Sequence, residues 1–134
     1  MSGEAFFDTN ILVYAIAEND PRAVRAEALL EAGGVVSVQV LNEFVSVARR
    51  KMRMPWKDVS EALDVIRVLC PSPVPVTIAI HESALQIAEN RGYEIYDALV
   101  LAAAVQAGCT ALYSEDFQDG QVIDGKLTIR NPFR

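Results

Sequence analysis

The sequence predicts an α/β fold, a three-layer α/β/α sandwich around a central, mainly parallel sheet. Short apolar runs alternate with longer segments of helical periodicity, and acidic residues directly follow two of these runs. Strands that alternate with helices favour a parallel sheet covered on both faces. With 134 residues, 51% hydrophobic and 22% charged, the chain predicts one globular domain over 1–134.

The first half of the chain alternates between the two kinds of segment. Gly33-Gly34 is a typical helix end, and Ser37 or Gln39 lies near the entry to the third helix. Glu43 shares a face of that helix with Val40 and Val47, at the edge of the core. The expected elements are a strand over 5–7, helices over 11–17 and 21–33, a strand over 35–38 and a helix to about residue 50.

The second half continues this alternation after a stiff connector that contains Pro71, Pro73 and Pro75. The helix that Asp97 opens or enters is apolar on nearly every side, which is typical of a helix buried against a sheet. The expected elements are a helix from 55 or 57, a short strand over 76–78, a helix over 80–90, the apolar helix, and strands over 110–113 and 127–129.

Four carboxylates stand in apolar surroundings, namely Asp8, Glu43, Asp97 and Asp116. A buried carboxylate without a partner is costly, and neighbouring carboxylates repel each other unless a positive charge lies between them. Asp8 and Asp116 each follow a predicted strand, so both are expected at the carboxyl edge of the sheet, where α/β folds bind ligands. The pattern predicts a divalent cation among these side chains.

The residue types restrict the chemistry of this site. Ligands that are all oxygen suit Mg²⁺ or Mn²⁺, whereas the single His81 and two dispersed cysteines do not make a zinc site. There is no Ser-His-Asp set, and Gly33-Gly34 lacks the lysine of a phosphate-binding loop. We therefore expect metal-assisted chemistry on a phosphoryl group, with one or two ions.

The net charge of −6 disfavours nucleic acid at first sight, but the basic residues are unevenly distributed. Arg49, Arg50, Lys51, Arg53 and Lys57 fall within nine positions. They either contact RNA or complement the end of a helix. Cys70 and Cys109 fit buried thiols in a reducing compartment, and neither a signal peptide nor a membrane span is expected, which predicts a cytoplasmic protein.

Each acid also has a purely structural interpretation. Asp8 and Asp97 are suited to cap the helices that follow them, Glu43 to reach solvent from a helix flank, and Asp116 to form an ordinary turn. The convergence of all four on one predicted edge favours the metal site. Outside the site, the expectations are an exposed or helix-start position for His81 and a core or interface position for Trp56 and Phe44.

The ordered motifs resemble the PIN-domain ribonucleases, and among them the VapC-type toxins of toxin–antitoxin pairs. The resemblance rests on Phe7-Asp8-Thr9-Asn10, Asn42-Glu43, Tyr96-Asp97-Ala98, Ser114-Glu115-Asp116 and the closing Ile129-Arg130-Asn131-Pro132. It implies endonucleolytic cleavage of RNA by metal-activated water, with Asp8, Glu43, Asp97 and Asp116 as catalytic and metal-binding residues.

The resemblance also implies supporting residues and partners. Ser114 and Asn10 would hold the site by hydrogen bonds, and Asp119 is an additional acid nearby. The expected partners are RNA, a second copy of the chain in a homodimer, and a small antitoxin whose basic side chain reaches the acidic pocket.

Two other functions compete with this interpretation. A phosphatase of the haloacid dehalogenase type also begins with a strand and an aspartate, but it needs a second aspartate where Asn10 stands. A PIN-like module that binds RNA or protein without cleaving it would use the same fold. Metal-dependent cleavage of structured RNA by the wild type, compared with Asp8→Asn and Asp97→Asn, separates the nuclease from this binding module.

Overall fold

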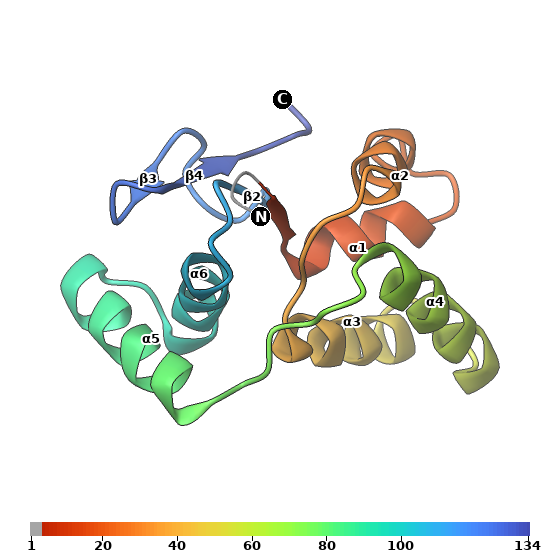
Figure 1. The fold of residues 1–134 in the computed structure, drawn as a ribbon. Coiled ribbons are helices and arrows are strands. Elements are labelled where there is room, and N and C mark those ends of the chain that lie inside the picture. The colour runs from red at the N-terminus through yellow and green to blue at the C-terminus, as the bar shows by residue number, and fades with distance from the viewer. Residues whose placement is uncertain (1–3) are drawn as a thin grey trace.

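The computed structural model describes residues 4–134 (Figure 1). Helices occupy most of the chain, and the strands are short. The elements in order are β1 (Ala5–Phe7), α1 (Thr9–Ile16), α2 (Ala23–Glu31), α3 (Val38–Arg50), α4 (Trp56–Leu69), α5 (Ile78–Arg91), α6 (Ile95–Gln106), β2 (Ala111–Tyr113), β3 (Val122–Ile123) and β4 (Leu127–Arg130).

A four-stranded sheet in the order β1-β2-β4-β3 forms the middle layer. The pairs β1–β2 and β2–β4 are parallel, and β3 adds to β4 in the antiparallel sense. Helices α5 and α6 pack together on one side of the strands, while α1 to α4 form a second group on the other side (Figure 1). The predicted three-layer α/β/α sandwich with a mainly parallel sheet is therefore confirmed.

The core lies between the sheet and the helices on both sides. Helix α6 contributes six buried residues from Ala98 to Ala104, as expected for a helix that is apolar all round. Phe44 is fully buried and belongs to this core. Trp56 does not: its exposed fraction is 60%, so of the two predicted positions the core is wrong, and the interface stays a prediction. Within residues 4–134, no helix is both long and apolar enough to cross a membrane.

Two predicted strands are wrong. The segment 35–38 forms only single bridges, Phe6 with Val35 and Ser37 with Val74, and Val38 already begins α3. The segment 76–78 forms no strand, because the Thr77 hydroxyl accepts the N–H of Ile80 and caps α5. Apolar β-branched residues favour strands locally, but in both cases a hydroxyl residue begins a helix within the run.

Two further differences concern element ends. Glu94, rather than Asp97, is the N-cap of α6 and accepts the N–H of Asp97 at 3.0 Å. Strand β3 was not expected, because two residues are too few to show an alternating pattern. Ser37 is the N-cap of α3, as one of the two positions predicted for the start of that helix.

Gly34 lies against the first strand. A Cβ atom at Gly34 would come within 2.6 Å of both the carbonyl oxygen of Ala5 and the Phe7 ring. The adjacent Val35 exchanges backbone hydrogen bonds with Ala5 and Phe7 at 2.8 and 3.0 Å. A glycine is therefore needed for this segment to approach β1.

Candidate metal-binding and active site

Asp8 lies at the carboxyl end of β1, where the strand passes into α1. Its N–H donates to the carbonyl of Tyr113 at 3.1 Å, which holds it beside the end of β2. The Asp8 carboxylate accepts the N–H of Thr9 at 2.7 Å and the hydroxyl of Ser114 at 2.8 Å. Asp8 is thus both the N-cap of α1 and a buried acid at the sheet edge.

The loop after β2 brings Asp116 to the same edge. Fully buried Ser114 accepts the N–H of Asp116 at 3.0 Å while donating to Asp8. The Asn10 side-chain amide donates to Asp116 at 3.1 Å and to Ser114 at 3.3 Å, and its oxygen accepts the N–H of Glu115 at 3.4 Å. Asn10 and Ser114 therefore connect the two strand ends that carry the acids.

Glu43 approaches this edge from α3. The Thr9 hydroxyl donates to one of its carboxylate oxygens at 3.1 Å, and the Gln39 amide donates to the other at 2.9 Å. The same Gln39 amide lies 3.4 Å from the carbonyl oxygen of Tyr96 in α6. Gln39 thus connects the helix that carries Glu43 with the one that carries Asp97.

Asp97 lies half-buried in the first turn of α6. Its pKa is raised above the usual value, chiefly by burial and then by the negative charges of Glu94, Asp116 and Glu43. The pKa of Asp8 is raised to about 6, chiefly by burial, with Asp116 and Glu43 adding to the rise against the hydrogen bonds from Ser114 and Thr9. The four acids therefore share one electrostatic environment.

This environment contains no neutralising ion pair among the described residues. The ion pairs there join Arg22 to Asp20 and Glu115, and Arg91 to Asp124, and none includes the four acids. Carboxylate and hydroxyl oxygens are the donors that Mg²⁺ and Mn²⁺ prefer. Within residues 4–134, however, no three His, Cys, Asp or Glu side chains are close enough to hold an ion as they stand. The donor types and charges fit a hard cation, and binding one requires the carboxylates to converge further.

A hollow of about 260 Å³ opens beside these acids. Glu43 and Asp116 line it, and Lys51 brings a positive charge to its wall. The other lining residues come from α1 and α3, namely Thr9, Asn10, Val13, Tyr14 and Val47. A phosphate group approaching the acids would therefore find one cation and several hydrogen-bond donors in this hollow.

Comparison with known proteins identifies the family. A family model described as PIN domain matches residues 5–118, which include all four acids. The chain belongs to the PIN domain family. No curated protein matches the sequence.

Solved structures share the PIN fold with this chain. The Mycobacterium tuberculosis toxin VapC20, described as cleaving the sarcin–ricin loop, is 21% identical with a TM-score of 0.68, over 84% of this chain and 91% of that one. A toxin–antitoxin complex from Klebsiella pneumoniae is 20% identical with a TM-score of 0.73, over 96% and 98%. VapBC2 from Rickettsia felis, bound to a promoter DNA fragment, is 18% identical with a TM-score of 0.66, over 95% and 98%.

The remaining predicted site residues of this PIN domain lie further from the acids. Asp119 is exposed, and its carboxylate accepts the backbone N–H of Asn131 at 2.8 Å, so it stabilises the C-terminal segment. Arg49 and Arg50 lie in the last turn of α3, where they also complement the helix dipole. Arg53 is exposed in the following turn, and Lys51 alone of the basic group lines the hollow.

The structure adds residues that the sequence did not point to. Arg22 stacks over the Tyr14 ring at 3.7 Å, donates to its hydroxyl at 2.8 Å and lies 3.4 Å from the Glu115 carboxylate. Tyr14 also hydrogen-bonds Glu115, and its pKa rises to about 12, chiefly through burial and then through Glu115. This group, the Arg22–Tyr14–Glu115 triad, fixes the loop that carries Asp116. In the sequence Arg22 is only a basic residue after Asp20-Pro21, and this pattern does not indicate such a role.

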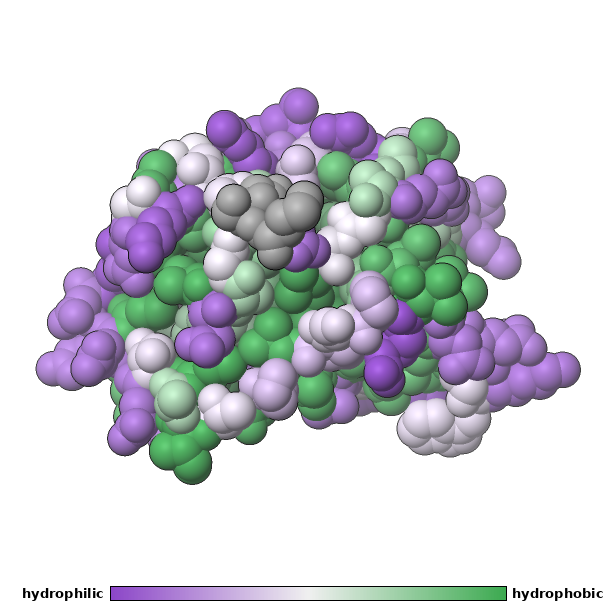
Figure 2. Space-filling view, viewed as in Figure 1, coloured by the Kyte–Doolittle hydropathy of each residue, from purple (hydrophilic) through white to green (hydrophobic). Residues whose placement is uncertain are grey.

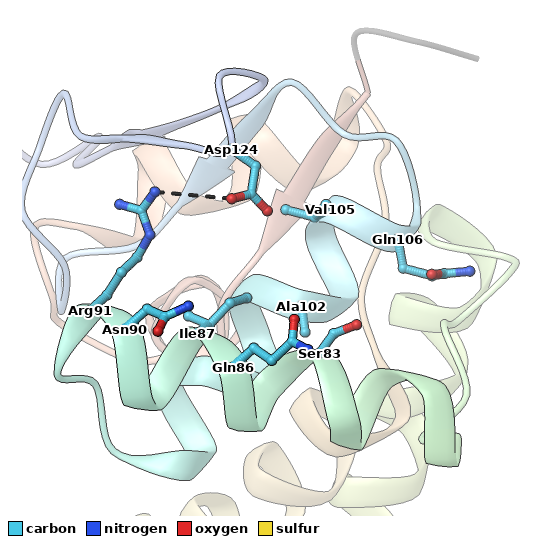
Figure 3. Close-up of a pocket in the computed structure, with 9 residues that line it drawn as sticks. All are labelled: Ser83, Gln86, Ile87, Asn90, Arg91, Ala102, Val105, Gln106 and Asp124. Atoms are coloured by element: carbon cyan, nitrogen blue, oxygen red, sulfur yellow. Dashed lines mark ion pairs between the residues drawn. The ribbon is translucent and has the colours of Figure 1, made fainter.

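A second hollow, of about 190 Å³, lies between α5 and α6. Figure 3 shows Arg91 and Asp124 joined by an ion pair at 4.0 Å on one side of it and polar α5 side chains along its base. None of the four acids lines this hollow, so it is separate from the PIN-domain site.

Proposed function

We propose that this PIN domain is a metal-dependent endoribonuclease and the toxin of a type II toxin–antitoxin pair. The observation that carries the proposal is the buried Asp8, whose pKa is raised to about 6 beside Asp116 and Glu43, with no cationic side chain paired to it among residues 4–134. A divalent cation would offset both the cost of burying the Asp8 charge and the repulsion from the neighbouring carboxylates. Family membership and the likeness to solved toxins support nuclease chemistry.

In this proposal Asp8, Glu43, Asp97 and Asp116 hold one or two Mg²⁺ or Mn²⁺ ions. A bound ion supplies positive charge to the scissile phosphate and a water of lowered pKa. Ser114 orients one oxygen of Asp8, and Thr9 and Gln39 each orient one oxygen of Glu43. Asn10 holds Asp116 at the strand edge. These hydrogen bonds restrict the orientations of the ligand side chains before the ion and RNA arrive, and a bound ion would then draw the carboxylates closer together.

The proposed partners are RNA, a small antitoxin and a second copy of the chain. Two of the solved structures that share the fold are described as a toxin–antitoxin complex and as VapBC2 on promoter DNA, which supports an antitoxin. A basic antitoxin side chain would neutralise the acids in place of a metal ion. The homodimer rests on the family resemblance alone.

The test is cleavage of structured RNA by the purified protein with Mg²⁺ or Mn²⁺, and with EDTA. We expect cleavage only with metal, and a loss of more than about a hundredfold in Asp8→Asn and Asp97→Asn, because each removes a charged ligand. Asp64→Asn is the matched control, since Asp64 is exposed on α4, away from the site. Unchanged cleavage by both site variants contradicts the assignment.

The second candidate is a PIN-like module that binds RNA or protein without cleaving it. It is favoured by the absence, within residues 4–134, of three carboxylates already close enough to hold an ion. RNA binding without cleavage at any metal concentration would support this alternative and contradict the nuclease.

A further inference from the structure

Trp56 is the only tryptophan in the chain and begins α4 with an exposed fraction of 60%. Its neighbours Pro55, Lys57 and Asp58 are exposed as well. The indole is therefore an exposed aromatic surface with charged residues directly after it in the chain. In Figure 2 hydrophilic side chains gather at the end of the molecule where α4 begins.

The indole ring is held in a defined orientation. The Arg49 guanidinium lies over it at 4.5 Å, and its Nη1 donates to the carbonyl oxygen of Met54 at 2.8 Å. Arg49 thus connects the last turn of α3 to the chain just before α4. An aromatic ring fixed by a stacked cation is prepared to accept a second planar group at low cost in side-chain entropy.

Positive charges precede this ring in the chain. Arg49, Arg50, Lys51 and Arg53 form what we call the basic turn, and all four are exposed. None of them forms an ion pair with a residue in the described part of the chain. Although the chain has a net charge of −6, these unpaired positive side chains favour the binding of a polyanion at this place.

The basic turn also adjoins the hollow that Glu43 and Asp116 line, which we call the acidic hollow. Lys51 lines that hollow, and the next residues, Met52 to Pro55, line a hollow of about 510 Å³ with the end of α1. Trp56 lies five positions after Lys51, so their Cα atoms lie at most about 18 Å apart. A single strand a few nucleotides long can therefore reach from the ring to the hollow that Lys51 lines.

We propose that Trp56 and Arg49 form a stacking site for a base of single-stranded RNA, and that the basic turn holds the phosphates between this base and the acidic hollow. The inference rests on the proposed nuclease function and adds a substrate-binding site to it. Bases of unpaired RNA stack on aromatic rings and guanidinium planes, while basic side chains bind the backbone. The unpaired positive charges of the basic turn favour a polyanion over a protein partner here, and the exposed charged residues Lys57 and Asp58 follow the ring directly.

The test uses the fluorescence of the single tryptophan. Decauridylate RNA is titrated into the protein of residues 1–134 in EDTA, which prevents cleavage, at several salt concentrations. We expect quenching of Trp56 emission that saturates and weakens as salt rises, because stacking needs the base and the phosphates need the basic turn. Inorganic polyphosphate, which has no bases, should compete with the RNA without quenching.

Variants separate stacking from charge. Trp56→Leu should bind labelled decauridylate about tenfold more weakly, which corresponds to about 1.4 kcal/mol, while Trp56→Phe keeps most of the affinity. Val68→Ala, an exposed change on the same helix, is the matched control and should bind like the wild type. With metal present, Trp56→Leu should raise KM for single-stranded RNA with kcat unchanged.

The outcomes separate the two proposals. If RNA quenches the wild-type emission and Trp56→Leu binds RNA more weakly, but the wild type cleaves no RNA, the stacking site is upheld and the nuclease function is contradicted. Cleavage by the wild type, with no quenching and equal binding by Trp56→Leu, removes the stacking site alone. Emission that changes with protein concentration instead of with RNA assigns Trp56 to a contact between copies of the chain and also overturns the inference.

Discussion

Asp8 is a carboxyl group that the fold keeps at an energetic cost. Its pKa of about 6 lies above the ordinary value of 3.8 because burial and the charges of Asp116 and Glu43 disfavour ionisation. A raised pKa means that the folded state binds the proton more tightly than the unfolded chain does. The metal-free protein therefore loses stability as pH rises from about 4 through 6, and above that range the loss is complete.

The corresponding prediction concerns Asp8→Asn without metal. We expect this variant to be more stable than the wild type at pH 7.5, by at most about 3 kcal/mol, because asparagine carries no charge to bury. The difference should shrink toward pH 4, where Asp8 is protonated. Urea unfolding in EDTA at both pH values measures it, with Asp64→Asn as the exposed control. A variant less stable than the wild type at pH 7.5 would contradict the electrostatic account.

The sequence identified the acids better than their hydrogen-bond partners. Asp8 and Asp116 could be predicted to meet because both follow strands of a parallel sheet, and they are joined through Ser114 and Asn10. Gln39 could not be found, because a glutamine one turn before Glu43 is an ordinary polar residue of a helix surface. Its role depends on how α3 crosses α6, which helical periodicity does not contain.

The Arg22–Tyr14–Glu115 triad connects three elements at the side of the site. Arg22 precedes α2, Tyr14 belongs to α1, and Glu115 lies in the loop after β2. The neighbouring Asp116 is held by Asn10 and Ser114, and the Glu115 side chain anchors the same loop from the opposite side. The triad therefore acts as a positioning group for Asp116.

We predict that Arg22→Met lowers kcat/KM for RNA about tenfold, because displacement of a ligand by about an ångström is enough for such a loss. Arg22→Lys should restore only part of it, since lysine lacks the planar fork that stacks and donates together. Arg25→Met on the same helix is the control. The measurement that separates positioning from global stability is Mn²⁺ affinity by calorimetry, which should weaken in Arg22→Met and stay unchanged in Arg25→Met.

Element types were more predictable than their ends. The long periodic segments α3 and α4 could be placed because their apolar stripes are regular, and the end of α5 because Gly92 is a typical helix end. The segments around Val35 and Val76 were assigned to strands, but Ser37 and Thr77 cap helices there. Single bridges and a two-residue strand such as β3 depend on which neighbours the fold brings alongside them. Local patterns do not contain that information.

The charge of the whole molecule favours cation binding. Its net charge is −6, and the four acids concentrate part of it at one edge. No three candidate ligands in residues 4–134 are preassembled, so a bound ion should tighten the ends of β1 and β2 with α3 and α6. Metal binding and stability should therefore be coupled across elements that are distant in sequence.

We predict that Mn²⁺ at a hundred times its dissociation constant stabilises the wild type by about 2.7 kcal/mol, seen as a rise in Tm. EDTA should reverse the rise, and Asp8→Asn and Asp97→Asn should reduce it. Differential scanning calorimetry measures the effect, with Asp64→Asn as the charge-matched control. An equal rise in all four proteins would mean that the cation binds elsewhere.

The sheet edge that carries Asp8 is sensitive to substitution of Gly34. Any side chain there would displace either Ala5 or the Phe7 ring, and Asp8 directly follows this short strand. A substitution of Gly34 could then abolish activity, although this position has no polar side chain and no contact with substrate. A screen for inactive variants should therefore recover substitutions at Gly34 as well as at the four acids, although glycine has no side chain that could bind a metal ion or RNA.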